Sequence, residues 1–177
     1  MSTIPPVLTK IINLLLENKA NFTLLNHVAE GKSDLISKIR GTPTGAGAKA
    51  IVCEMKKLRE SEIEGVKALN LKDTDFILLI LSGDLQVDYK KLSNAINCKK
   101  ISMAKVDDVL KMTECVPGSV SPFSFNENLK IICDEKIFNR FEEICFNAGS
   151  LEHSLKMKSS DYLRIVKPFL GDFSKDL

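Results

Sequence analysis

A run of six consecutive apolar side chains at residues 76–81 constrains this fold more than any other feature of the sequence. It is the longest such run in the chain, and a membrane-spanning helix needs about 20 apolar residues. Its length and its lack of alternation are typical of a β-strand that is buried on both faces. The rest of the chain is therefore expected to cover both faces of the sheet that contains this strand.

Helices and strands alternate along the chain without a regular order. Apolar spacing and capping residues predict helices at about 6–19, 33–40, 89–96 and 105–112, a short one from Asp134, and a last one capped by Ser159 or Ser160. Strands are predicted at 22–25, 48–56, 75–81, 101–104, 129–133, 143–147 and 151–157. Because no βαβ period is visible, the predicted fold class is α+β (mixed α/β), with a mixed, partly closed β-sheet or barrel surrounded by helices.

The length of 177 residues predicts a single domain, 1–177, with an N-terminal helix at 6–19, a charged insertion at about 57–74 and a C-terminal tail at 171–177. With 44% hydrophobic residues and a formal net charge of +2, the chain is neither a disordered protein nor a basic arm. An RNA partner stays possible, because binding depends on where lysines gather. The sequence shows no signal peptide and no membrane span, so we expect a cytoplasmic protein that does not contact a membrane.

Five cysteines occur without a C-x-x-C pair, at positions 53, 98, 115, 133 and 145. Zinc sites and disulfide frameworks need paired, closer spacing, so no metal and no cofactor is expected. Most of these cysteines have apolar neighbours, where cysteine serves as a small core residue. The alternative is a nucleophilic cysteine paired with a distant histidine, for which His27 and His153 are the candidates.

A Gly- and Pro-rich loop at residues 41–47 precedes Lys49, which begins an apolar strand. The loop is not a Walker A motif, because Lys49 is followed by Ala50 rather than by Ser or Thr. It is not a dinucleotide fingerprint either, because it leads into a strand rather than a helix. Lys49 either extends its ammonium group to the surface or holds it near a phosphate or an ester carbonyl, where it would stabilise negative charge.

Two further segments are candidates for ligand contact. In the loop at 116–123, Gly118 and Pro122 bracket three residues in a rigid arrangement that can present backbone groups to a ligand, although a plain structural turn explains it equally well. In the turn at 147–153, His153 lies in the returning strand, where a structural histidine is the commoner case. No G-x-S-x-G nucleophile motif occurs anywhere in the chain.

In their order and spacing, four stretches of the chain resemble the YbaK family, also called the prolyl-tRNA synthetase-associated editing domain. They are the loop and strand at 40–52, the strand–turn–helix at 82–92 with its Asp-x-x-Lys-Leu signature, the segment 103–123, and the segment 146–155. Together they cover most of residues 22–167. The charged segment at 57–74 departs from compact members of the family, which have a tighter connection there.

The resemblance implies a trans-editing hydrolase, or an editing domain fused to a synthetase, that cleaves the ester between a wrong amino acid and the 3′-terminal adenosine of tRNA. It implies that Lys49 is the catalytic residue. It further implies that the substrate is bound by Gly118, Ser119, Val120, Ser121 and Pro122, by Gly149, Ser150 and His153, and by His27. An aminoacyl ester is already activated, so an oriented water and oxyanion stabilisation suffice without a protein nucleophile or metal.

The most specific expectation is hydrolysis of alanyl- or cysteinyl-tRNA(Pro), with the acceptor end of misacylated tRNA as partner and prolyl-tRNA synthetase in cis or in trans. A synthetase pocket built for a larger amino acid excludes a smaller one by only about 1–3 kcal/mol, so a second site must remove the errors. Two alternatives remain from the sequence. One is a non-catalytic module that binds tRNA or a synthetase. The other is a thiol-dependent enzyme.

Overall fold

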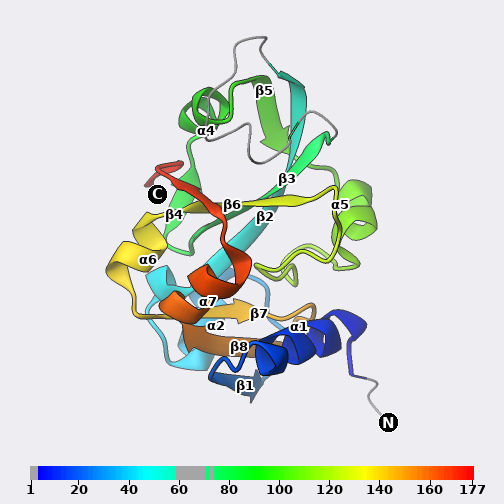
Figure 1. Ribbon diagram of the computed structural model, residues 1–177. Coiled ribbons are helices and arrows are strands. Elements are labelled where there is room, and N and C mark those ends of the chain that lie inside the picture. Colours follow the sequence, from blue (N-terminus) through cyan, green and yellow to red (C-terminus); the bar gives the residue numbers. More distant parts are fainter. Residues whose placement is uncertain (1–3, 59–70, 72–73) are drawn as a thin grey trace.

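The computed structural model describes residues 4–58, 71 and 74–177, so most of the predicted insertion at 57–74 lies outside the described residues. Its main sheet is mixed and has the order β5-β2-β3-β6-β9, in which β6 and β9 run parallel to their neighbours. A second sheet, β1-β8-β7, is antiparallel, and β10 pairs with β4 (Figure 1). The predicted α+β class is confirmed, but the described sheets are open and form no closed barrel.

The strand bounds are β1 (Phe22–Asn26), β2 (Ala48–Leu58), β3 (Phe76–Ser82), β4 (Leu85–Val87), β5 (Cys98–Met103), β6 (Lys130–Asp134), β7 (Glu143–Asn147), β8 (His153–Lys158), β9 (Phe169–Gly171) and β10 (Ser174–Asp176). The helix bounds are α1 (Pro6–Glu17), α2 (Ser33–Arg40), α4 (Tyr89–Ala95), α5 (Val106–Thr113), α6 (Lys136–Arg140) and α7 (Ser159–Val166), with a 3₁₀ turn η1 (Thr44–Ala46) before β2. No helix among these described elements is long and apolar enough to span a bilayer.

The apolar run at 76–81 forms β3 and is covered on both faces, as predicted. Leu78 and Ile80 belong to one core, and Ile77, Leu79 and Leu81 belong to another. The first core lies between the main sheet, the three-stranded sheet, α1 and α7. The second core lies on the opposite face, where α4 and the C-terminal segment pack.

The helices begin and end where local chemistry dictates. Asp88 caps α4 as predicted, accepting hydrogen bonds from the backbone N–H groups of Lys90 and Lys91 at 3.1 and 3.0 Å. Ser159 was expected as a cap but is itself the first residue of α7, and its hydroxyl donates to the carbonyl of Phe141. Gly41 ends α2 in the left-handed conformation, which a glycine adopts without strain.

The C-terminal residues expected as a tail are folded against the domain. Gly171 ends β9, and residues 174–176 form β10, whose partner β4 lies about 90 positions earlier in the chain. Phe173, between the two strands, is 1% exposed and belongs to the second core. Residues 171–176 are therefore part of the packed structure, whereas Leu177 is exposed.

Candidate active site

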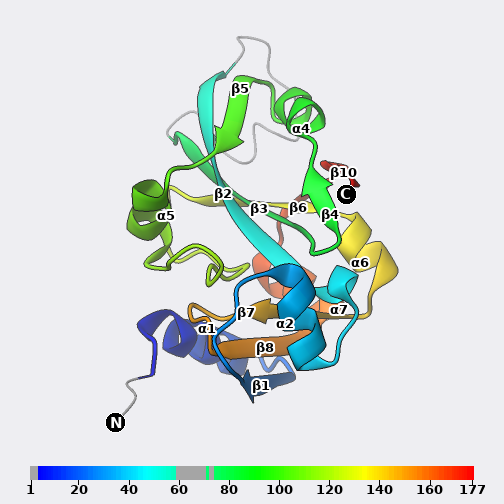
Figure 2. The ribbon, with the colours of Figure 1, turned by 180° about the vertical axis from the view of Figure 1, so that it is seen from behind.

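A cavity of about 340 Å³ opens at the seam between the two larger sheets. An isolated parallel bridge between Gly47 and Cys145 joins the sheets there, and Figure 2 shows β2 running down to α2 and β7. The wall is mostly apolar and backbone, and its polar side chains belong to Ser33, Arg40, Lys49 and Asn147. The other lining residues are Gly31, Ile36, Gly47, Ala48, Ala50, Ile51, Val52, Met103, Ala104, Val106, Val109, Pro117, Gly118, Val120 and Phe146.

Lys49 lines this cavity from β2, the second residue of the strand. Its ammonium group donates one hydrogen bond to the carbonyl of Leu85 at 2.5 Å, which leaves two of its three N–H groups for a ligand. Burial lowers the pKa of Lys49, and the nearby carboxylate of Asp84 opposes that shift. Asp84 itself is paired with Arg140, so its charge is shared between two cations.

Arg40 forms a second cationic wall of the cavity, from the last residue of α2. Its Nε donates to the hydroxyl of Ser154 at 2.9 Å, and its Nη2 donates to Oδ1 of Asn147 at 2.6 Å. Burial lowers the pKa of Arg40, with a smaller opposing effect from Cys145. Because a guanidinium group carries five N–H donors, donors remain for a ligand beyond these two bonds.

Asn147 ties together the loops around the cavity. Its amide nitrogen donates to the carbonyls of Glu30 at 2.9 Å and Gly118 at 2.7 Å. Its carbonyl oxygen accepts from Arg40 and from Ser154. Asn147 is 7% exposed, and its amide makes all of these bonds within the protein. It therefore fixes the position of Gly118, which lines the cavity.

His27 lies behind this network. Its Nε2 is 2.5 Å from the hydroxyl of Ser154, and its Nδ1 is 2.8 Å from the carbonyl of Val28. Ser154 is fully buried and joins the histidine to Arg40 and Asn147. His27 therefore does not line the cavity, and Ser154 connects it to two residues that do, Arg40 and Asn147.

The loop predicted to bind substrate divides into two groups. Gly118 and Val120 line the cavity. Ser119, Ser121 and Pro122 are buried below them, and their polar groups bond within the protein: the two hydroxyls donate to the carbonyls of residues 116 and 123, and the carbonyl of Pro122 accepts from Tyr162. These three residues support the loop from beneath.

The turn at 147–153 supports the same loop from the other side. The backbone N–H of Gly149 donates to the carbonyl of Ser119 at 3.0 Å. Nδ1 of His153 is 2.9 Å from the hydroxyl of Ser150, which also accepts from the backbone of Glu152. Gly149, Ser150 and His153 thus lie outside the lining of the cavity.

The cysteines carry no sign of nucleophilic chemistry. All five are buried and none forms a disulfide, and burial raises the pKa of Cys53 and of Cys133 to about 12. The pKa values of Cys115 and Cys145 are also raised by burial. Within the described part of the chain, no group of three or more His, Cys, Asp or Glu residues could hold a metal ion.

Sequence reasoning missed the roles of Arg40 and Asn147, although both lie inside the stretches that carry the family resemblance. Each looks ordinary in the chain: Arg40 ends a short helix, and Asn147 ends a strand. The available signal was an asparagine in an otherwise apolar strand, because a buried amide needs several partners. Its partner Arg40 could not be found from sequence, since the two are 107 positions apart.

The aminoacyl-tRNA editing domain matches residues 36–165. The chain is 40% identical over 166 residues to the multifunctional Ser/Thr-tRNA deacylase ProXp-y of Escherichia coli strain K12, covering 94% of this chain and 92% of the relative. It is 31% identical to a proline–tRNA ligase of Limosilactobacillus reuteri strain DSM 20016, over 34% of this chain and 11% of the ligase.

Solved structures share the fold. The hypothetical protein APE2540 superposes with a TM-score of 0.78 at 12% identity, covering 94% of this chain and 99% of that one. A candidate trans-editing enzyme for prolyl-tRNA synthetase superposes with a TM-score of 0.77 at 15% identity, covering 98% of this chain and 99% of that one. The chain therefore belongs to the aminoacyl-tRNA editing domain family, which confirms the family and the enzyme class, an aminoacyl-tRNA deacylase, predicted from the sequence.

Proposed function

We propose that this chain removes wrongly attached serine or threonine from tRNA by hydrolysing the ester at the 3′ end. The observation that carries the proposal is the cavity, which is lined by both Lys49, whose ammonium makes one hydrogen bond, and Arg40, whose guanidinium is fixed by two side chains. The 40% identity with a Ser/Thr-tRNA deacylase along nearly the whole chain supports the choice of amino acid.

The geometry suggests how the ester would react. The ester carbonyl would lie against Lys49, whose ammonium group stabilises the negative charge that develops on the carbonyl oxygen as water attacks. The exposed backbone of Gly118 also lines the cavity, and the sugar could approach there because no side chain projects. The remaining N–H groups of Arg40 would donate hydrogen bonds to the side-chain hydroxyl of serine or threonine.

Alanyl- and cysteinyl-tRNA(Pro) form the second candidate substrate class. Short segments of proline–tRNA ligases, 61 to 89 residues long, are 30–31% identical to this chain, which favours a link with proline. These matches cover at most 15% of the ligases, so action beside prolyl-tRNA synthetase in trans is also a proposal. If the cavity only excludes large amino acids, the protein should remove alanine as fast as serine. If the cavity binds the side-chain hydroxyl, it should remove serine faster than alanine.

The test is a panel of tRNAs charged with serine, threonine, alanine, cysteine or proline, with loss of the labelled ester followed over time. We expect Lys49→Ala to lower kcat by about 10²–10³-fold, the usual effect of losing one oxyanion donor. Lys56→Ala is the matched control, because Lys56 lies on the same strand with an exposed side chain outside the cavity.

Three results would contradict the proposal. Binding of tRNA without turnover of any ester would favour the non-catalytic module. Equal rates for the wild type, Lys49→Ala and Lys56→Ala would remove Lys49 from the mechanism. Faster loss of alanine or cysteine than of serine or threonine would replace the first substrate class with the second.

A further inference from the structure

The acceptor of the Lys49 hydrogen bond belongs to a short strand that packs two side chains, Leu85 and Val87, into the second core. Leu85 is the first residue of β4, which has three residues and follows β3 after a tight turn. Within the described residues β4 does not join the main sheet, and its strand partner is β10. Asp176 lies opposite Leu85 in that pair, and the side chain of Gln86 donates to the carbonyl of Asp176 at 2.8 Å.

We propose that residues 172–176, here called the clasp, are a positioning element for the active site: they hold β4, and with it the carbonyl of Leu85 that fixes the Lys49 ammonium. The inference rests on the proposed function, because it gives Lys49 the catalytic role. The clasp acts through β4 and does not touch the cavity.

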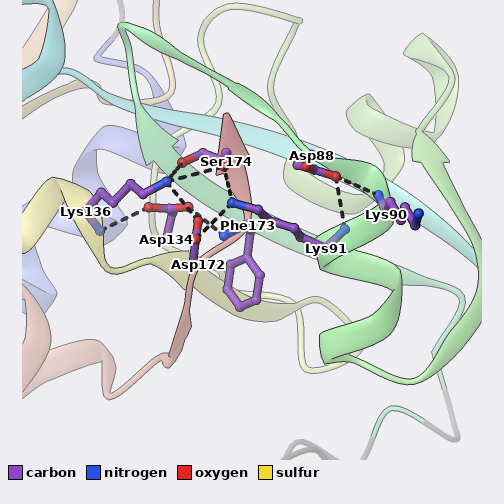
Figure 3. Close-up of polar contacts among 8 residues, drawn as sticks. All are labelled: Asp88, Lys90, Lys91, Asp134, Lys136, Asp172, Phe173 and Ser174. Atoms are coloured by element: carbon purple, nitrogen blue, oxygen red, sulfur yellow. Dashed lines mark hydrogen bonds and ion pairs between the residues drawn. The ribbon is translucent and has the colours of Figure 1, made fainter. Parts of the chain in front are cut away.

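Ion pairs attach the clasp to two helices (Figure 3). The carboxylate of Asp172 is 2.9 Å from the ammonium of Lys91 on α4 and 2.9 Å from that of Lys136 on α6. The same two ammonium groups reach the carbonyl of Ser174 at 3.0 and 3.3 Å. The start of β10 is therefore held between α4 and α6.

Buried hydrogen bonds fix the backbone between these ion pairs. The N–H of Phe173 donates to the carboxylate of Asp134, which is fully buried, at 2.7 Å. The carbonyl of Phe173 accepts from the N–H of Asp88 at 2.8 Å, so the clasp is joined to the residue that links β4 with α4. The clasp is thus bonded to β4 along the paired edge of that strand, from Leu85 to Asp88, the residue that follows the strand.

Removal of the Phe173 ring and removal of the Asp172 carboxylate should affect the protein differently. The ring of Phe173 contributes to the second core, so removing it would unfold that part of the protein. The Asp172 carboxylate is half exposed, and exposed ion pairs add little to stability. Its removal is expected to leave the fold intact while β4 gains freedom. A displacement of about 1 Å at a catalytic group can lower the rate by roughly a hundredfold.

The test compares Asp172→Ala and Lys136→Met with Asp161→Ala. Asp161 is a matched control, because it forms a surface ion pair of the same length with Arg164 on α7, away from the clasp. We expect both clasp variants to lower kcat for ester hydrolysis about tenfold or more with KM unchanged, and the control to behave as the wild type. A loss confined to KM, or equal kcat in all four proteins, overturns the inference.

A measurement without substrate separates this inference from the proposed function. The ¹⁵N signal of the Lys49 ammonium, assigned with Lys49→Arg, reports the hydrogen bond to Leu85 through its slow proton exchange. Loss of that signal in the clasp variants but not in Asp161→Ala supports the clasp, even if the wild type hydrolyses no ester and the proposed function fails. An unchanged signal in the clasp variants overturns the clasp whatever the activity.

Discussion

Two cations share one cavity but are held in different ways. Arg40 is fixed by two side chains, and its planar donors can meet a ligand in one orientation. The ammonium of Lys49 is held by one hydrogen bond, to the backbone carbonyl of Leu85, which leaves N–H donors for an oxygen that gains negative charge. Arg40 thus suits recognition of a ligand, and Lys49 suits stabilisation of negative charge.

Gly149 shows how one residue connects the site to the N-terminal helix. Its φ is +75°, and a Cβ added there would lie 2.5 Å from Cβ of Val7 on α1. We expect Gly149→Ala to destabilise the protein by about 2–4 kcal/mol, from left-handed strain together with displacement of α1. Urea unfolding measures the change.

The control for this prediction is Gly41→Ala. Gly41 also has a left-handed φ, +65°, but a Cβ there would meet nothing within 4 Å. Gly41→Ala should lower the free energy of unfolding by about 1 kcal/mol, because only the left-handed backbone conformation is then strained. Equal losses for the two variants would show that the contact with α1 contributes nothing.

At the scale of elements, the stability that the ion pairs of the clasp contribute should decrease in acid. Hydrogen bonds from Lys136 and then Lys91 lower the pKa of Asp172 to about 2, against roughly 4 in an unfolded chain. A carboxyl group with a lowered pKa stabilises the fold above its unfolded pKa, and that contribution disappears as the pH falls through the folded value. The window is therefore about pH 4 to pH 2.

We expect wild type to exceed Asp172→Asn in stability by at most about 1 kcal/mol at pH 5, because the group is largely exposed and screened. This difference in stability between the two proteins should disappear by pH 2 and become smaller in 1 M salt. Urea midpoints of both proteins across this range measure it. A gap that persists at pH 2 would mean that the aspartate acts through packing rather than charge.

Most elements of five residues or more were predictable from sequence, whereas the three-residue strands were not. The 76–81 run and the α1 pattern carry enough apolar residues to identify β3 and α1 from local sequence alone. The strands β4, β9 and β10 have three residues each and exist because a distant partner pairs with them. Lys49 could be found from its loop and its family resemblance, whereas its acceptor, Leu85, is a backbone group without any sequence signature.

At the scale of the whole molecule, the five thiols report on global unfolding. With a pKa of about 12, Cys53 and Cys133 have about a thousandfold less thiolate at neutral pH than exposed cysteines. We expect iodoacetamide to label the native protein more than a hundredfold more slowly than the protein in guanidinium, and to leave ester hydrolysis unchanged. Mass spectrometry counts the labels. Rapid labelling of one thiol with loss of activity would restore the thiol-dependent alternative.

The cavity lies on the seam between two sheets, where a single bridge joins Gly47 to Cys145. Its width therefore depends on how the sheets are spaced by the aromatic cluster of Phe123, Phe146 and Tyr162 in the first core. Of these rings only that of Phe146 belongs to a lining residue. Substitutions at Phe123 or Tyr162 can consequently change the shape of the cavity from behind its wall, while Lys49 and the loop before it stay unchanged.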